Sequence, residues 1–135
     1  MNKILRLAAA GVLAFAAAHA FARGNVPIVN HEAIPATTGA GQPATPEQIR
    51  TALQTAGSPR GWEIRPAGDG KALAVLNVRG KHSVSADITY TRGQYAIKYR
   101  ESTNMNYDSA ANTIHPKYNM WVQTLIEDTR AQLLK

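Results

Sequence analysis

The feature that most constrains the fold of this sequence is a set of four short runs, between residues 61 and 100, in which apolar and polar residues alternate. A period of two places successive side chains on opposite faces of a β-strand. Segments that contain glycine separate the runs, at residues 66–70, 79–81 and 92–93. Short turns of this kind join antiparallel neighbours. The sequence therefore predicts a four-stranded antiparallel meander.

The last turn also predicts a register. If Arg92 and Gly93 form a two-residue loop, the strands on either side are fixed relative to each other. The opposite pairs are then Tyr90 with Tyr95, Ile88 with Ile97, and Asp87 with Lys98. This arrangement places aromatic and aliphatic pairs on the buried face and opposite charges on the other. The second run, residues 71–79, has apolar residues at both its odd-numbered and its even-numbered positions. We therefore expect a central or partly covered strand, and its register stays open.

Two helical patterns flank the four runs. Thr45, Pro46 and Gln48 have the residue types and the spacing of a capping box with proline in the first turn. A longer helix is predicted to open at residues 114–117. Its apolar stripe consists of Tyr118, Trp121, Val122, Leu125, Ile126, Thr129 and Leu133. Residues 45–135 are therefore predicted to form a two-layer α+β domain of order α-β-β-β-β-α.

The N-terminal region predicts export. Lys3 and Arg6 precede an apolar run over residues 7–18, which closes on small-x-small cleavage patterns within residues 18–22. This order is typical of a secretory signal peptide, and the run is shorter than the roughly 20 apolar residues that a membrane-spanning helix needs. We therefore interpret residues 1–22 as a signal peptide that is removed.

A flexible linker is predicted at residues 23–44. Glycine, proline, alanine and threonine dominate this segment, and its apolar residues show little periodicity. Pro27, Pro35 and Pro43 disfavour both a helix and a central strand. A segment of this composition is typical of a linker that holds a domain away from whatever precedes it.

The composition restricts the compartment and the partners. The chain has no cysteine, so it carries neither a disulfide nor a lipid-bearing cysteine at the signal junction. It has 15 Lys and Arg against 9 Asp and Glu, and its net charge of +6 falls to +4 without Lys3 and Arg6. No run of like charges exceeds two residues, which argues against a basic tail for nucleic acid. We expect a periplasmic or secreted protein without a stable membrane anchor.

Basic residues of the predicted sheet form the first candidate binding site. The members of this site are Arg65, Arg79, Lys98 and Arg100. Arg65, Lys98 and Arg100 fall on the polar face of the strands, where Glu63 and Asp87 neutralise part of the charge. Arg79 lies near the second turn. The tyrosines of the fourth strand point inward, so the aromatic platform of a single-strand nucleic-acid binder is missing. This face is predicted to meet an envelope protein or a small anionic ligand.

An alternative candidate site combines His115 with Asp108 or Tyr107, as in a small hydrolase or lyase. The sequence has no nucleophile elbow of the Gly-x-Ser-x-Gly type, and its histidines lack the spacing of a zinc site. We therefore expect no metal and no cofactor. His82 alternates in phase with core residues near a strand end, and we interpret it as a hydrogen-bonded histidine at the core edge.

His115 also has a structural interpretation. It comes directly before Pro116, where a side chain can bond to the free amide groups at the start of a helix. Tyr118 and Asn119 follow in the first turn, and we expect them to tie the preceding loop at residues 104–107 to that helix.

Several short motifs together resemble a family of small, uncharacterised exported proteins of Gram-negative bacteria. The motifs are Gly61-Trp62, Arg79 with His82, Asp87-Ile88-Thr89-Tyr90, Tyr95-Ala96-Ile97-Lys98-Tyr99, Ser102, and the Ile-His-x-x-Tyr-Asn-x-Trp element that begins at Ile114. The resemblance covers roughly residues 45–134 and implies an exported α+β domain. Many members of the family look like lipoproteins, but this chain lacks the lipid-bearing cysteine.

These patterns favour a non-enzymatic periplasmic binding module that works through the open sheet face or through the second apolar side of residues 71–79. The alternatives are a hydrolase or lyase that uses His115, and a binder of small anionic ligands. A small-molecule enzyme is expected to have a concave pocket with convergent polar groups around His115, whereas an interaction module is expected to have a flat or grooved face.

Overall fold

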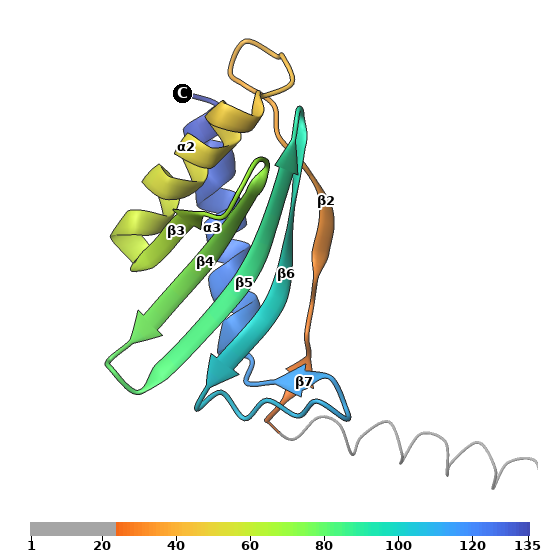
Figure 1. The fold of residues 1–135 in the computed structure, drawn as a ribbon, viewed down its shortest axis with the longest axis vertical. Coiled ribbons are helices and arrows are strands. Elements are labelled where there is room, and N and C mark those ends of the chain that lie inside the picture. Colours follow the sequence, from red (N-terminus) through yellow and green to blue (C-terminus); the bar gives the residue numbers. More distant parts are fainter. Residues whose placement is uncertain (1–23) are drawn as a thin grey trace, which may run out of the picture.

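The computed structural model describes residues 24–135, so the predicted signal peptide at 1–22 lies outside the described residues. The described chain has an α+β fold, in which two helices cover one face of an antiparallel sheet and leave the other face open (Figure 1). The predicted α+β class with two helices is confirmed. Within residues 24–135, no helix is both long and apolar enough to cross a membrane.

The sheet contains five strands in the order β2-β6-β5-β4-β3. Their bounds are His31–Pro35 for β2, Trp62–Pro66 for β3, Lys71–Val78 for β4, His82–Thr91 for β5 and Gln94–Thr103 for β6. The helices are α2 (Pro46–Gly57), the short 3-10 turn η2 (Ser58–Arg60) and α3 (Lys117–Leu133). Two further short strands, β1 (Val26–Pro27) and β7 (Thr113–Ile114), pair with each other.

The predicted meander corresponds to β3, β4, β5 and β6, which pair as neighbours in chain order. The predicted register of the last hairpin is confirmed: Tyr90 lies opposite Tyr95, Ile88 opposite Ile97, and Asp87 opposite Lys98. The register then shifts between Ser85 and Ala86, and Arg100 is the extra residue of β6 at this bulge. Bulges bend a strand and re-aim the side chain of the extra residue.

The apolar residues on both sides of the second run are explained by the position of β4 inside the sheet. Strand β4 lies between β3 and β5, with Leu76 opposite Trp62 and Val84. Leu76 and its in-phase neighbours face the helices and are buried. Leu73 and Val75 lie on the open face and stay half-buried among the side chains of the adjacent strands.

The predicted count of four strands is wrong, because residues 23–44 contribute a fifth. The composition of this segment predicts a flexible linker, but β2 pairs antiparallel with β6. Ile28, Ala36 and Ala44 from the same segment are buried in the core. Proline is compatible with β2 because an edge strand donates ladder hydrogen bonds on one side only. The proline-rich composition therefore marked an edge strand and not a strand-free linker.

Both helices contain the predicted features. The hydroxyl of Thr45 accepts a hydrogen bond from the Gln48 N–H at 3.1 Å, and the Gln48 side chain accepts one from the Thr45 N–H at 2.9 Å. Helix α3 begins at Lys117, later than predicted, because Ile114 belongs to β7. Five residues of its predicted stripe are buried: Tyr118, Val122, Leu125, Thr129 and Leu133. Trp121 and Ile126 are only partly buried against the core.

Residues 24–36, called the N-terminal strap below, are tied to the start of α3 by Asn119. The Asn119 side-chain oxygen accepts a hydrogen bond from the Val29 N–H at 3.1 Å, and its amide donates to the Pro27 carbonyl at 2.9 Å. The prediction that Asn119 holds the loop at 104–107 is therefore wrong. One amide side chain instead satisfies a donor and an acceptor of the strap.

Replacing Asn119 with alanine is expected to loosen the strap selectively. Loss of the two hydrogen bonds should lower the free energy of unfolding by about 1–2 kcal/mol. The amide proton of Val29 should exchange much faster with solvent. The amide protons inside α2 should exchange faster only to the extent that the whole protein is less stable. Met120→Ala, at an exposed neighbouring position, is the control. Unchanged exchange at Val29 in the Asn119 variant would contradict this role.

Candidate functional site

Three of the four predicted binding residues lie on the open face of the sheet. Each forms an ion pair with a nearby carboxylate: Arg65 with Glu63 at 2.8 Å, Lys98 with Glu32 at 3.1 Å, and Arg100 with Asp87 at 3.0 Å. The hydrogen bond from Arg65 holds the pKa of the Glu63 carboxyl below its ordinary value. Each of these three cations therefore has an acidic partner, whereas Lys71 of β4, which is exposed on the same face, takes part in none of the ion pairs found within residues 24–135.

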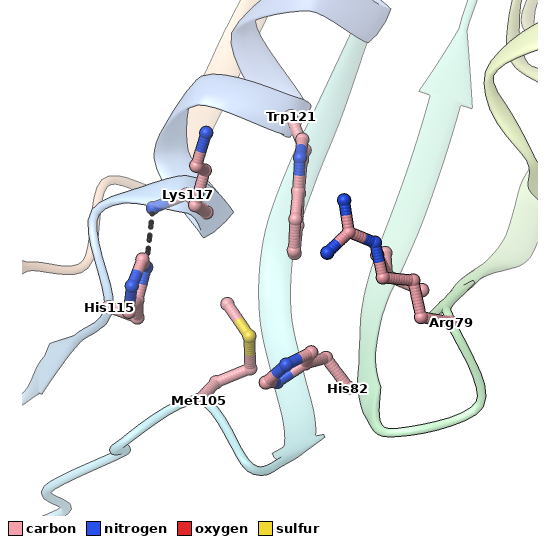
Figure 2. A pocket seen from close by; sticks show the side chains of 7 residues that line it. Arg79, His82, Met105, His115, Lys117 and Trp121 are labelled. Carbon is pink, nitrogen blue, oxygen red and sulfur yellow. Dashed lines mark hydrogen bonds between the residues drawn. The ribbon is translucent and has the colours of Figure 1, made fainter.

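The fourth predicted residue, Arg79, lies away from the other three and lines a cleft between the β4–β5 turn and α3 (Figure 2). The cleft has a volume of about 370 Å³, which is in the range of small-molecule sites. Its lining residues are Val78, Arg79, His82, Met105, His115, Lys117 and Trp121. They come from the β4–β5 hairpin, the loop after β6, and the start of α3. Three chain segments that are distant in the sequence therefore build one concave site.

The backbone of the β4–β5 turn places Arg79 at the cleft. Arg79 and Gly80 both have left-handed backbones, with φ of 57° and 67°, and the Lys81 N–H donates to the Val78 carbonyl at 3.1 Å. Two left-handed central residues define a type I′ turn, whose twist matches that of antiparallel strands. Glycine adopts this conformation freely, whereas arginine does so at a cost in free energy. In Figure 2 the guanidinium group of Arg79 extends toward the Trp121 ring.

The hydrogen bonds of the two cleft histidines determine which ring nitrogen carries the proton. His82 Nδ1 lies 2.8 Å from the Asn104 carbonyl oxygen. A carbonyl only accepts, so His82 Nδ1 donates, and in the neutral ring Nε2 keeps a free lone pair. His115 Nδ1 instead accepts from the Lys117 N–H at 3.1 Å, so its neutral ring carries the proton on Nε2. The two rings therefore offer a ligand opposite hydrogen-bonding groups.

These contacts bear out the structural interpretations of both histidines. His115 bonds to a free amide of the first turn of α3, as its position before Pro116 predicts. His82 is half-buried at the start of β5 and hydrogen-bonded to the loop that follows β6. Both rings nevertheless line the cleft, so a structural bond on Nδ1 leaves the rest of each ring available to a ligand.

The charge of the cleft differs from that of the open sheet face. No aspartate or glutamate is among the seven lining residues. Arg79 and Lys117 take part in none of the five ion pairs found within residues 24–135. Trp121, Met105 and Val78 supply apolar walls, and Arg79 and Lys117 are exposed at the rim of the cleft. The arrangement is suited to an anion with an apolar part.

The alternative catalytic set is not assembled. Neither Asp108 nor Tyr107 is among the residues that line the cleft with His115. The Asp108 carboxylate accepts hydrogen bonds from the N–H groups of Ala110 and Ala111, at 3.0 and 3.1 Å, and so closes its own turn. Tyr107 packs on Tyr99, with ring centroids 4.8 Å apart. Asp108 therefore bonds within its own loop and Tyr107 packs against β6, which is why the sequence proximity to His115 was misleading.

Five cleft residues were absent from both sequence-based candidate sites: Val78, His82, Met105, Lys117 and Trp121. Trp121 was assigned to the core because its spacing matches the apolar stripe of α3. A position at the border of such a stripe is half-buried, and a large aromatic ring there lines the adjacent cleft. Lys117 lies four residues earlier on the same helix face. A lysine and a tryptophan at this spacing could have indicated that this border of the stripe lines a cleft. Within residues 24–135, no three acidic or histidine side chains are grouped as metal ligands.

No family model, curated protein or solved structure matches this chain.

Proposed function

We propose that this protein is an exported, non-enzymatic binding module that holds a small anionic ligand in the cleft between the β4–β5 turn and α3. The observation that carries the proposal is the combination of Arg79 and Lys117, which lie outside all described ion pairs, with apolar walls and no acidic lining residue. An anion that enters such a site gains charge-assisted hydrogen bonds without displacing a competing carboxylate.

The contrast with the open sheet face supports the cleft as the site. Arg65, Lys98 and Arg100 each have a carboxylate partner that competes with an anionic ligand for the cation. A flat surface also leaves a small ligand exposed to water, which screens its charge. A concave site of about 370 Å³ beside an indole ring removes a small anion from water on several sides.

Export belongs to the proposal and rests on the sequence pattern of residues 1–22. Lys3 and Arg6, the apolar run that follows, and the small-x-small exit favour transfer to the periplasm or the medium. The ligand is then a soluble anion of that compartment, or one that enters it from outside the cell.

Replacing Arg79 with glutamine tests the site. Benzoate, a carboxylate with an apolar ring, is titrated into the purified protein and followed by two-dimensional NMR. We expect shifts at His82, Lys117 and the Trp121 indole. Loss of a hydrogen bond to a charged group removes about 1.5–3 kcal/mol, so Arg79→Gln should weaken binding roughly 10-fold to 100-fold.

Arg65→Gln is the matched control, because it removes the same charge from the open face. Benzoate binding should be unchanged in this variant. Equal weakening by the two substitutions would mean that only the net charge matters, and it would exclude the cleft as the site. Shifts confined to β3 and β6 would move the ligand to the sheet face.

A hydrolase or lyase is the second candidate, and the opposite tautomers of His82 and His115 in one cleft favour it. A free lone pair and an N–H are the groups that general base and general acid catalysis require. The probe is 4-nitrophenyl phosphate, whose hydrolysis releases a coloured phenolate. Release that is lost in His82→Gln and retained in Lys98→Gln would establish the enzyme. No release by a protein that binds benzoate would favour the binding module.

A further inference from the structure

His82 can take up a proton in the cleft without losing the hydrogen bond that holds its ring. Its Nδ1–H donates to the Asn104 carbonyl at 2.8 Å, and a histidine can donate in this way in its neutral and in its charged form. The Asn104 side chain in turn donates to the Lys81 carbonyl at 2.7 Å. The second proton of a charged ring goes to Nε2, the nitrogen that this bond leaves free.

His115, the other histidine of the cleft, differs in this respect. Its Nδ1 accepts the Lys117 N–H at 3.1 Å, and a proton on that nitrogen would break the bond. The ring also lies at the start of α3, where the helix dipole disfavours a positive charge. Of the two histidines, His82 is therefore the one that can become charged while the walls of the cleft keep their hydrogen bonds.

The charged residues next to His82 and in the lining of the cleft are basic. Arg79 and Lys81 belong to the same hairpin, and Lys117 lines the cleft from α3. None of them supplies the negative charge that favours a proton on a histidine. An anion bound in the cleft would supply it.

The acidic residues of the surrounding segments lie elsewhere. Asp108, in the loop after β6, closes its own turn. Glu101 of β6 lies opposite Ser85, which is out of phase with the helix-facing residues of β5, so Glu101 is on the open side of the sheet. The acidic residues of α3, Glu127 and Asp128, come about three turns after its start. None of these carboxylates lines the cleft beside His82.

We propose that the cleft binds its anion together with one proton from solvent, which His82 takes up on Nε2. This inference rests on the proposed anion-binding function and adds the regulation of that site by pH. In the complex, the charged ring donates from Nδ1 to Asn104 and from Nε2 into the cleft that Arg79 also lines (Figure 2). The complex then holds more protons than the free protein, so linkage makes the affinity for the anion rise as pH falls.

Benzenesulfonate is the probe, because a sulfonate stays ionised at mildly acidic pH and only the protein then changes its charge. Histidines change charge between about pH 5 and 8, and hydrogen bonds to charged groups are the stronger ones. The affinity should therefore be roughly 10-fold higher at about pH 5.5 than at about pH 8. Isothermal titration calorimetry in two buffers with different heats of ionisation counts the protons that are taken up on binding.

Two glutamine variants identify the group that takes up the proton. His82→Gln keeps a side-chain N–H for the Asn104 carbonyl but cannot become charged, so the pH dependence should be lost. His31→Gln, in β2 and outside the cleft, is the matched control and should keep the pH dependence of the wild type. The ring signals of His82 in wild-type NMR spectra test the same claim without a variant. With benzenesulfonate bound, they should report the charged ring up to a higher pH than without it.

Each outcome bears on one claim. Binding that is equally strong at both pH values, but weaker in Arg79→Gln, would overturn the uptake of a proton and retain the anion site. A pH dependence that survives in His82→Gln would also overturn it, and its loss in His115→Gln would assign the proton to His115. If neither benzoate nor benzenesulfonate binds at any pH, the proposed function itself fails and this inference fails with it.

Discussion

Leu125→Ala is expected to lower the free energy of unfolding by about 2–5 kcal/mol, because it leaves a cavity where α3 packs on α2 and β3. Leu125 is 1% exposed, and its Cδ1 lies 3.4 Å from the position that a Cβ on Gly57 would occupy. The same point lies 2.9 Å from the Trp62 Cβ, so the junction has no room for α2 to move in and refill the space. The loss is a large part of the 5–15 kcal/mol that is typical of a domain.

Leu134→Ala is the control for this prediction. It removes the same atoms from a leucine at the end of α3 that is 51% exposed, so the change should stay within about 0.5 kcal/mol. Thermal unfolding followed by circular dichroism distinguishes the two, because 1 kcal/mol corresponds to about 4–8 °C for a domain of about 100 residues. A Leu125→Ala variant that melts within ~3 °C of the wild type would show that this junction is looser than its packing implies.

The second large effect is expected at alkaline pH. Burial raises the pKa of Tyr95 to about 12, and burial also raises the pKa of Tyr118, whose hydroxyl has no hydrogen-bond partner within residues 24–135. Below pH 10 both phenols are protonated in the folded and in the unfolded state. Between pH 10 and 12 the unfolded chain releases these protons while the folded chain retains them, so stability falls as pH rises. Two pKa units at Tyr95 alone correspond to about 3 kcal/mol.

Urea unfolding at several pH values from 8 to 12 measures this loss. Lysines also release protons in this range, so the informative quantity is the difference between the wild type and Tyr95→Phe. The free energy of unfolding of the phenylalanine variant should fall less steeply with pH. Between pH 10 and 12 the difference in slope should correspond to the release of nearly one proton on unfolding. Parallel profiles for the two proteins would mean that the Tyr95 phenol titrates in the folded state as it does in the unfolded state.

The part of the fold that the sequence predicts is the part determined by local rules. Alternation and the two-residue turn at Arg92 and Gly93 are enough for the register of β5 and β6. The capping box at Thr45 and the stripe of α3 follow from spacing along one element. Strand β2 could not be predicted in this way, because its pairing partner is distant in the sequence and its own apolar residues are few.

The ion pairs show how one missed element changes a surface. Lys98 lies opposite Asp87 as predicted, but its ion pair is formed with Glu32 of β2. Asp87 pairs with Arg100, which the bulge of β6 brings alongside it. The sequence therefore located these basic side chains of the sheet and could not determine which acidic partner each of them has.

The candidate site was only partly predictable for a related reason. The sequence singled out Arg79 and His115 separately, and assigned them to two different sites. They line one cleft because the β4–β5 turn and the start of α3 meet at the same end of the sheet. No periodicity within a segment encodes this meeting, which depends on the packing of α3 across the whole sheet.

The short outer strands of the sheet have a consequence for how copies of this protein meet. Both β2 and β3 end in a proline, Pro35 and Pro66, which lacks the N–H that an incoming strand would need. Charged side chains also lie on these border strands, Glu32 on β2 and Glu63 and Arg65 on β3, and charges on an edge strand disfavour the addition of another strand. Strand-by-strand polymerisation, the route to fibrils, is thus obstructed at both ends of the sheet.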